Sequence, residues 1–440
     1  MSSSSEQAIR GWPRESRVSS ALRLLRTHTS GGKVFTGSVI MLAGSAFVSI
    51  ANFGYNIGVA HLLGPGDFSQ AAAAVTLLML ASCINLAFQL VTAKLIARAT
   101  SKPERAAIYQ TLTKRAWYVG AALTAFLFLV RVPLANYLRL PETRLVDVLA
   151  LGMLFYIPLG VRRGAMQGLC QFVRLSANLT AEAVVKLVGA MAFIFFGAGV
   201  FGAVGAISLS VFGAYLLPAG DKELRIKASG EFDSHFMEGM QAIIFFVGQV
   251  IINNVDILMV KHYFASEDAG VYAAVALVGR LLYFATWSVT SAMFPVSAGA
   301  SVEKESRRVM VVPLLFVIAL SSIFVVFLGA FPNVIVHVLF GNGFHRVDIN
   351  MAELLIMNAV ATGIYALAVV LIAYEMSRRI ANTGWFQLVV SVAVMGGVVF
   401  FHGSLLQVIV VQQVLRGILL LAVSIPFLFG HAHSVGEEAV

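Results

Sequence analysis

The sequence predicts an all-α membrane protein that crosses the bilayer about twelve times. Of its 440 residues, 59% are hydrophobic and only 12% are Asp, Glu, Lys or Arg, about half the charged fraction of a typical soluble domain. The mean hydropathy is +0.85, and apolar runs long enough to span a membrane recur from Val34 to Phe429. These observations exclude a soluble enzyme, a disulfide-bonded scaffold and a disordered chain.

The expected spans are apolar runs bounded by charged residues or by glycine and proline. In the first half of the chain they are 36–60, 71–92, 117–138, 146–166, 177–197 and 199–217. In the second half they are 236–260, 271–296, 309–331, 351–373, 384–402 and 404–429. Tight breaks at Gly197–Gly199 and His402–Gly403 each separate two consecutive spans. Merging either pair would place the two termini on opposite sides of the membrane.

A polar stretch with seven charged residues, 219–235, divides the spans into two groups of six. We therefore expect a first lobe at 34–218, a cytoplasmic linker at 219–235 and a second lobe at 236–430, flanked by a basic segment at 1–33 and a tail at 431–440. The segment 1–33 lacks the short apolar core of a cleavable signal peptide. It forms either a short helix on anionic lipid or a disordered basic tail.

Basic residues are concentrated at one end of the predicted spans. Twenty-three Lys and Arg fall on the amino-terminal side and five on the opposite side. Because cytoplasmic loops carry the excess of Lys and Arg, both termini are expected in the cytoplasm. Three basic residues lie inside spans instead: Lys186, Arg280 and Arg416.

Polar side chains recur at helical spacing in four spans, the first two of each half. Each must face protein or water, because hydrocarbon does not solvate it. One interpretation is a hydrated central cavity between the halves, and the other is interhelical hydrogen bonding worth about 1 kcal/mol or less per contact. The pairing of the stripes favours a substrate-binding cavity. The striped residues are Asn52 and Asn56, Asn85 and Gln89, Gln249, Asn253 and Asp256, and Arg280, Tyr283 and Trp287.

Arg280 is the strongest candidate for a substrate contact. It lies about ten residues inside its span, roughly 15 Å deep at about 1.5 Å per residue. A cation at that depth needs compensation, either from an anionic group on the substrate or from Asp256.

The other basic candidates carry two interpretations each. Lys186 either pairs with Glu182, four residues before it, or contacts phosphate. Arg416 either contacts phosphate or reaches the lipid headgroups. Three more arginines, near the cytoplasmic ends of the fourth and fifth spans, either anchor the topology or attract an anionic headgroup from the cytoplasmic leaflet. They are Arg162, Arg163 and Arg174.

The two halves also share a local pattern. Asn56–His61, which ends the first span, stands 200 residues before Asp256–Lys261, which ends the seventh. Because each half has an even number of spans, the halves are expected to be parallel repeats with a cleft between them.

Short motifs carry a family resemblance over roughly residues 34–430. The motifs are Leu62–Phe68 (LLGPGDF), Gln167–Phe172 (QGLCQF), and Asp256–Leu258 with Gly270–Ala273 (GVYA). In this order and spacing they resemble the Wzx-like oligosaccharide flippases, polysaccharide biosynthesis proteins of the multidrug/oligosaccharidyl-lipid/polysaccharide (MOP) exporter superfamily. The sequence departs from the family pattern where Ser69 and Gln70 replace a glycine and an aromatic residue.

The resemblance implies a V-shaped, MATE-like pair of six-helix lobes in a bacterial inner membrane. It also implies alternating-access transport, to the outer leaflet, of an oligosaccharide linked to a lipid of the undecaprenyl-diphosphate type. The product would serve surface polysaccharide synthesis, with a polysaccharide polymerase as a candidate partner.

Two other functions stay open. One is a multidrug exporter driven by H⁺ or Na⁺, in which Asp256 or Glu182 titrates. The other is a non-transporting membrane partner of a polymerase, in which water does not reach the polar residues of the stripes. The sequence has no Gly-rich phosphate loop and no paired Cys/His spacing. We therefore expect no enzymatic reaction, cofactor, metal site or nucleic-acid partner. We also expect the protein to be a monomer.

Overall fold

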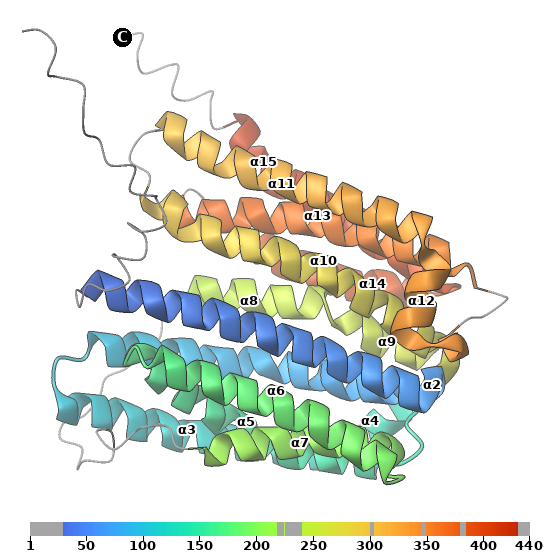
Figure 1. Ribbon diagram of the computed structural model, residues 1–440, viewed down its shortest axis with the longest axis horizontal. Coiled ribbons are helices and arrows are strands. Elements are labelled where there is room, and N and C mark those ends of the chain that lie inside the picture. Colours follow the sequence, from blue (N-terminus) through green and yellow to red (C-terminus); the bar gives the residue numbers. More distant parts are fainter. Residues whose placement is uncertain are drawn as a thin grey trace, which may run out of the picture.

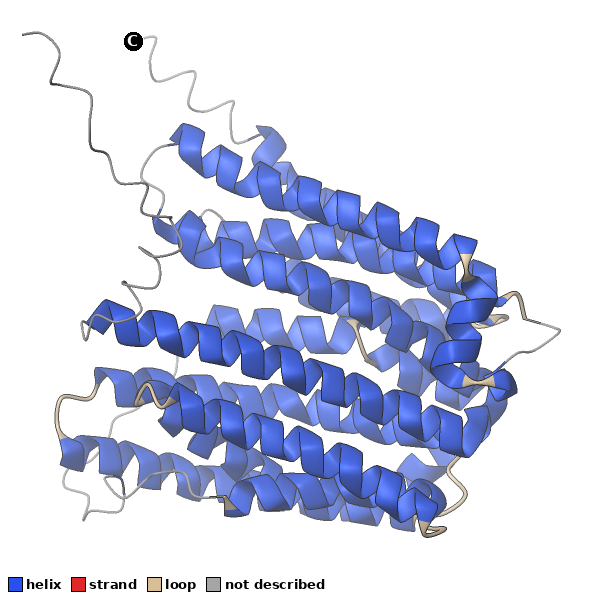
Figure 2. Cartoon of the chain, viewed as in Figure 1, coloured by secondary structure: helices blue, strands red, loops and turns tan. Residues whose placement is uncertain are grey.

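The computed structural model describes residues 30–217, 224, 240–299, 303–344, 349–378 and 384–429. These residues form long helices that run side by side, and they contain no strand (Figures 1 and 2). The predicted segment 1–33, apart from its last four residues, lies outside them. So do the predicted linker, apart from Leu224, and the tail at 431–440.

The first two predicted spans form one kinked helix, α2 (Ser30–Arg98). The kink falls at Gly64, whose backbone angles are φ 75° and ψ 177°. Only glycine adopts this region readily, and Pro65 next to it provides no backbone N–H. The label α2 therefore covers two helices, which correspond to the first two predicted spans, and the chain reverses direction between them at Gly64 (Figure 1).

The rest of the first half follows the predicted order. A capping box between Ser101 and Glu104 begins α3 (Lys102–Leu129), which is bent by 65° from α4 (Arg131–Tyr137). The predicted third span thus consists of the end of α3 together with α4. The remaining helices are α5 (Arg144–Gly168), α6 (Phe172–Phe195) and α7 (Gly199–Leu216).

In the second half the seventh predicted span is broken into α8 (Met240–Ile252) and α9 (Val255–Tyr263). The side-chain amides of Asn253 and Asn254 donate to the carbonyls four residues earlier, at 2.8 and 2.7 Å. Such bonds compete with the helical ladder, and two of them in succession coincide with the break. The later elements are α10 (Ser266–Gly299), α11 (Glu303–Ala330), α12 (Pro332–Phe340), the 3₁₀ helix η2 (Asn342–Phe344), α13 (Met351–Arg378), α14 (Gly384–Phe400) and α15 (Leu405–Phe429).

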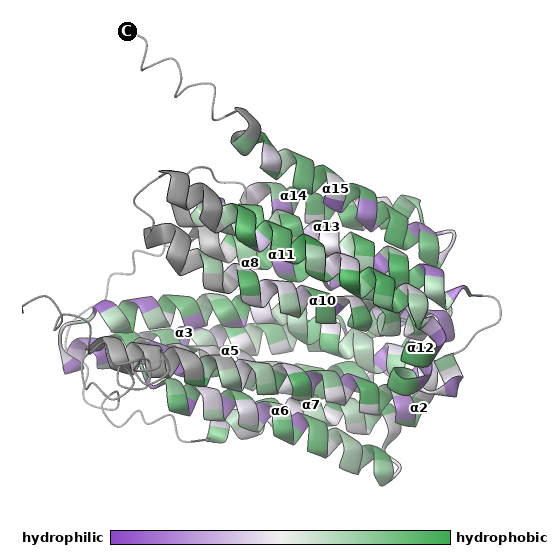
Figure 3. Ribbon diagram, turned by 45° about the horizontal axis from the view of Figure 1, so that its top comes forward, coloured by the Kyte–Doolittle hydropathy of each residue, from purple (hydrophilic) through white to green (hydrophobic). Residues whose placement is uncertain are grey.

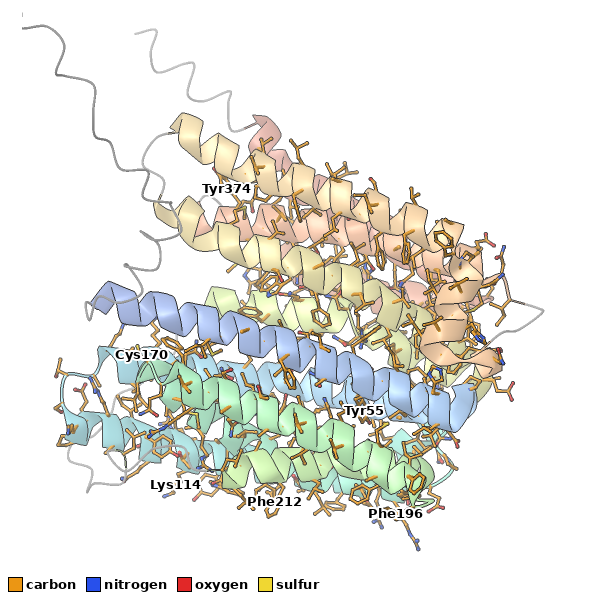
Figure 4. All side chains as sticks on the ribbon, in the orientation of Figure 1. Tyr55, Lys114, Cys170, Phe196, Phe212 and Tyr374 are labelled. Carbon is orange, nitrogen blue, oxygen red and sulfur yellow. The ribbon has the colours of Figure 1, made fainter. Side chains whose placement is uncertain are left out.

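Among the described residues, nine helical segments are long and apolar enough to cross a membrane, or ten if α3 and α4 form one span. The second half of α2 and the short apolar helix α14 account for the remaining predicted spans. Hydrophobic residues cover most of the outward faces of the helices (Figure 3). Phe196 and Phe212 illustrate this at the edge of the first half (Figure 4). The predicted all-α membrane fold is confirmed.

The helices of the two halves form two groups, α2–α7 and α8–α15, joined where α2 packs against α8, α9 and α10 (Figure 1). Near its start α2 is exposed, as at Phe47 and Ile50, whereas Phe68–Val75 beyond the kink are buried. Along α10 the order is reversed, because Ala269–Gly279 are buried and Phe284 is exposed. The halves are thus packed together at the end that holds Gly64, called the kink end below, and their facing helices become exposed toward the opposite end.

Candidate functional site

A small polar pocket of about 20 Å³ lies inside the second half, among α9, α10, α13, α15 and the break between α8 and α9. It has room for about one water molecule. Five of the predicted site residues line it together with three others. The lining residues are Asn253, Asp256, Arg280, Tyr283 and Arg416, with Ala276, Asn358 and Thr362.

The break between α8 and α9 positions both arginines of the pocket. A broken helix leaves carbonyl groups without their usual partners. Arg280 of α10 donates to the Asn253 carbonyl at 3.3 Å, and Arg416 of α15 donates to the Ile252 carbonyl at 3.0 Å. Two guanidinium groups are therefore fixed next to each other by main-chain oxygens, as at the discontinuous helices of transporters.

Asp256 belongs to a chain of hydrogen bonds that crosses three helices. The Tyr272 hydroxyl donates to the Asp256 carboxylate at 2.7 Å and accepts from the Gln412 amide at 2.6 Å. The Gln412 carbonyl oxygen accepts from Arg416 at 3.0 Å. Within the described residues Asp256 forms no ion pair with Arg280, so the arginine is not neutralised by direct contact.

Several polar atoms around the pocket have no partner in the described structure. They are Asp256 Oδ1, Arg280 Nε, Arg416 Nε and the Tyr283 hydroxyl. Buried polar atoms are paired in most proteins, so four unpaired ones at one place call for a ligand or water. With two guanidiniums and one carboxylate the pocket carries a net positive charge, which suits an anionic group.

Aromatic rings lie around Tyr283, which lines the pocket. Trp287 does not line the pocket but stacks on Tyr283 and Phe245, with ring centroids 6.4 Å apart in both cases. Tyr283 also stacks on Tyr365 at 5.8 Å, and the Arg416 guanidinium lies 5.5 Å from the Tyr365 ring. Gln249 is a buried neighbour whose backbone carbonyl accepts from Asn253.

The polar stripe of the first half does not reach this pocket. Asn85 donates to the Tyr156 carbonyl at 2.5 Å, and Gln89 donates to Gln167 at 3.1 Å, so both bond to α5. Within α2, Asn56 donates to the carbonyl of Asn52 at 2.8 Å. The residues Asn52, Asn56, Asn85 and Gln89 thus make contacts inside the first half.

Arg163, Glu182 and Lys186 form a second charged cluster, inside the first half. Glu182 of α6 forms its ion pair with Arg163 of α5 and not with Lys186. Arg163 also donates to Asn178 at 2.9 Å. Lys186 is buried with its Nζ 5.4 Å from the centre of the Tyr55 ring, whose place on α2 is labelled in Figure 4.

The predicted headgroup contacts Arg162, Arg163 and Arg174 lie in different surroundings. Arg163 is held in the ion pair just described. Arg162 is buried, donates to the Leu217 carbonyl at 2.9 Å and lies over the Tyr215 ring. Arg174 alone is exposed, and it donates to Gln171 at 3.1 Å.

Sequence reasoning missed the contribution of α13 to the pocket. Asn358 and Thr362 are spaced by one helical turn, and Tyr365 follows near the same face. The spacing that revealed the other stripes was therefore present in the tenth span too. In the described part of the chain, no group of three His, Cys, Asp or Glu side chains is placed to hold a metal ion.

Comparison with known proteins adds a family and a fold. Residues 59–348 match the family described as polysaccharide biosynthesis protein, and no curated protein sequence matches the chain. The fold is similar to an inward-facing multidrug resistance MATE family transporter of the MOP superfamily, with a TM-score of 0.74, 14% identity and coverage of 91% of this chain and 99% of that one. The fold is also similar to an outward-facing multidrug resistance MATE family transporter of the MOP superfamily, with a TM-score of 0.63, 16% identity and coverage of 95% of this chain and 99% of that one. A third similar structure is the lipid II flippase MurJ in its inward closed conformation, with a TM-score of 0.73, 12% identity and coverage of 88% of this chain and 87% of that one.

Proposed function

This chain belongs to the polysaccharide biosynthesis protein family, and we propose that it is a flippase for a lipid-linked oligosaccharide of surface polysaccharide synthesis. The cargo we propose is an oligosaccharide on a lipid of the undecaprenyl-diphosphate type. Arg280 and Arg416 carry this proposal, because each has a buried Nε without a partner beside a pocket of net positive charge. Guanidinium groups bind phosphate oxygens with two parallel hydrogen bonds where geometry allows.

The size of the pocket limits how the cargo binds. Room for about one water molecule admits a phosphate oxygen but not a whole diphosphate. The diphosphate therefore rests against the pocket wall, with Arg280 and Arg416 as its contacts. The prenyl tail stays in lipid, since each buried CH₂ group favours hydrocarbon by about 0.8 kcal/mol.

The direction of transport follows from charge and packing. Lys and Arg are concentrated at the end opposite the kink end, which we assign to the cytoplasm of a bacterial cell. The halves are packed together at the kink end, so cargo enters from the cytoplasmic side and rocking of the lobes releases it outward. An inside-negative potential favours outward movement of an anionic headgroup by about 2.3 kcal/mol per charge per 100 mV.

Substitution of Arg280 in a strain that makes lipid-linked surface polysaccharide tests the proposal. Arg280→Ala is expected to abolish export and Arg280→Lys to reduce it, because lysine offers a point charge in place of a bidentate fork. The matched control is Arg131→Ala, since Arg131 is exposed and pairs with Asp147 at 3.2 Å on the surface. Normal export by both Arg280 variants, at normal protein levels in the membrane, would remove Arg280 from the mechanism.

A second candidate function, an ion-driven multidrug exporter, is favoured by the unpaired Oδ1 of buried Asp256. A carboxylate oxygen in such a site can bind H⁺ or Na⁺. Drug efflux that is lost in Asp256→Asn, without any polysaccharide defect, would favour the exporter over the flippase.

A further inference from the structure

We propose that Lys261 is a latch residue that sets how easily the kink end opens: it is hydrogen-bonded across the two halves when they are closed, and the cost of burying its charge keeps the closure reversible. The inference rests on the alternating access of the proposed function, and not on the identity of the cargo. Lys261 is the last residue of the Asp256–Lys261 segment, which the sequence pattern pairs with Asn56–His61 of the first half.

Lys261 joins helices from both halves of the protein. It lies near the end of α9 with 1% of its surface exposed. Its Nζ donates to Ser69 of α2 at 2.8 Å and to Ser266 of α10 at 2.7 Å. The Ser69 hydroxyl donates in turn to the Gly66 carbonyl at 2.5 Å. One ammonium group therefore connects the segment after the α2 kink to the second half.

The partners of this ammonium group are neutral. Among the described residues it forms no ion pair, and the charged groups near enough to influence it are Asp67, of opposite sign, and Arg139, of like sign. Burial of an ammonium costs free energy unless it is paired and hydrogen-bonded. Two serine hydroxyls compensate only part of that cost.

Other contacts across the kink end favour closure without such a cost. Gly270 of α10 packs so tightly on the Pro65 carbonyl that a Cβ atom there would overlap it. The rings of Tyr137 and His262 stack 3.9 Å apart, and the Phe68 ring meets that of Phe344 at 5.9 Å. These neutral contacts stabilise the closed end, and the buried charge of Lys261 opposes them. Water would reach Lys261 only when the halves part.

Substitutions of Ser69 and of Lys261 are expected to have opposite effects on how often the kink end opens. Replacing Ser69 with alanine removes one of two partners from a buried cation, which favours opening. Replacing Lys261 with methionine removes the cost of burying the charge and keeps the volume, which favours closure. In the double variant no lysine is left to lose its partner, so the effect of the serine substitution disappears.

Labelling of one cysteine measures how often the kink end opens. In a full-length chain carrying Cys83→Ala and Cys170→Ser, the substitution Ala269→Cys places a thiol in the buried first turn of α10. A membrane-impermeant maleimide added to intact cells reacts with it only when the kink end opens. We expect Ser69→Ala to raise the labelling rate about tenfold and Lys261→Met to lower it about tenfold. The double variant is expected to stay at the Lys261→Met rate.

A matched serine on the same helix provides the control. Within the described residues the Ser82 hydroxyl donates to the Met79 carbonyl of its own helix and makes no hydrogen bond across the halves, so Ser82→Ala should leave labelling unchanged. Equal signs for the two single variants, or additive effects in the double variant, would overturn the latch. Absence of labelling in every variant would overturn the latch together with alternating access. The expected labelling pattern in a protein that exports no polysaccharide would support the latch and refute only the proposed cargo.

Discussion

Replacing Tyr272 with phenylalanine should destabilise the protein more than the same change at two other buried tyrosines. The Tyr272 hydroxyl donates to the Asp256 carboxylate and accepts from Gln412. Without it, neither oxygen of Asp256 retains a hydrogen bond among those described. Among the described residues, the Nε2 group of Gln412 then keeps a 3.5 Å contact with the Val408 carbonyl.

The size of the effect follows from the partners of each hydroxyl. A hydrogen bond to a charged group contributes about 1.5–3 kcal/mol, so Tyr272→Phe should lower the free energy of unfolding by about that amount. The Tyr55 hydroxyl donates to a neutral partner, the Ala203 carbonyl, at 3.1 Å, and such bonds in membrane proteins average about 0.6 kcal/mol. The Tyr283 hydroxyl has no partner in the described part of the chain, so Tyr283→Phe should change the stability by less than either.

Equilibrium unfolding in mixed micelles of a mild detergent and SDS measures all three variants. The expected order of destabilisation is Tyr272→Phe, then Tyr55→Phe, then Tyr283→Phe. All three lose the same atom from a buried ring, so lost packing cancels in the comparison. If Tyr272→Phe lowers the free energy of unfolding no more than Tyr283→Phe does, the hydrogen bond from Tyr272 to Asp256 does not contribute to stability. The hydrogen-bond chain from Asp256 to Arg416 would then not stabilise the fold.

Two further substitutions test packing and charge by the same unfolding measurement. Gly270→Ala should destabilise the protein by about 1–3 kcal/mol, because the new methyl group overlaps the Pro65 carbonyl. Gly205→Ala, where nothing lies within 4 Å, should be neutral or slightly stabilising; an equal loss at both glycines would contradict the close packing. Glu182→Gln should destabilise by about 3 kcal/mol, because the buried guanidinium of Arg163 loses its partly buried anionic partner. A normal free energy of unfolding in this variant would show that Asn178 alone is sufficient for Arg163.

The fold was predictable because its signals are local. Apolar length and charged boundaries predicted helices such as α5 and α15 within a few residues. The kink at Gly64 was not predictable in the same way, since Gly-Pro-Gly is typical of a turn and of a kink alike. The break at Asn253 depends on side-chain bonds back to the preceding turn, and polar residues in a span do not by themselves show that they make such bonds.

The candidate site was predictable in composition but not in its contacts. Helical spacing placed Asn253 and Asp256 in the polar stripe of the seventh predicted span and Arg280 in that of the eighth, and all three line the pocket. Spacing cannot reveal partners on other helices. Glu182 pairs across to α5 in place of its neighbour four residues away. The hydroxyl that donates to Asp256 comes from Tyr272 of α10, which accepts in turn from Gln412 of α15.

The main-chain anchors of the two pocket arginines have a consequence for divergence within the family. Every amino acid carries a carbonyl group, so point mutations at positions 252 and 253 cannot delete the oxygens that orient Arg280 and Arg416. As long as the helix stays interrupted there, changes in the neighbouring side chains leave these two anchors in place. In the proposed flippase, specificity for different glycans could then evolve around the same pair of arginines.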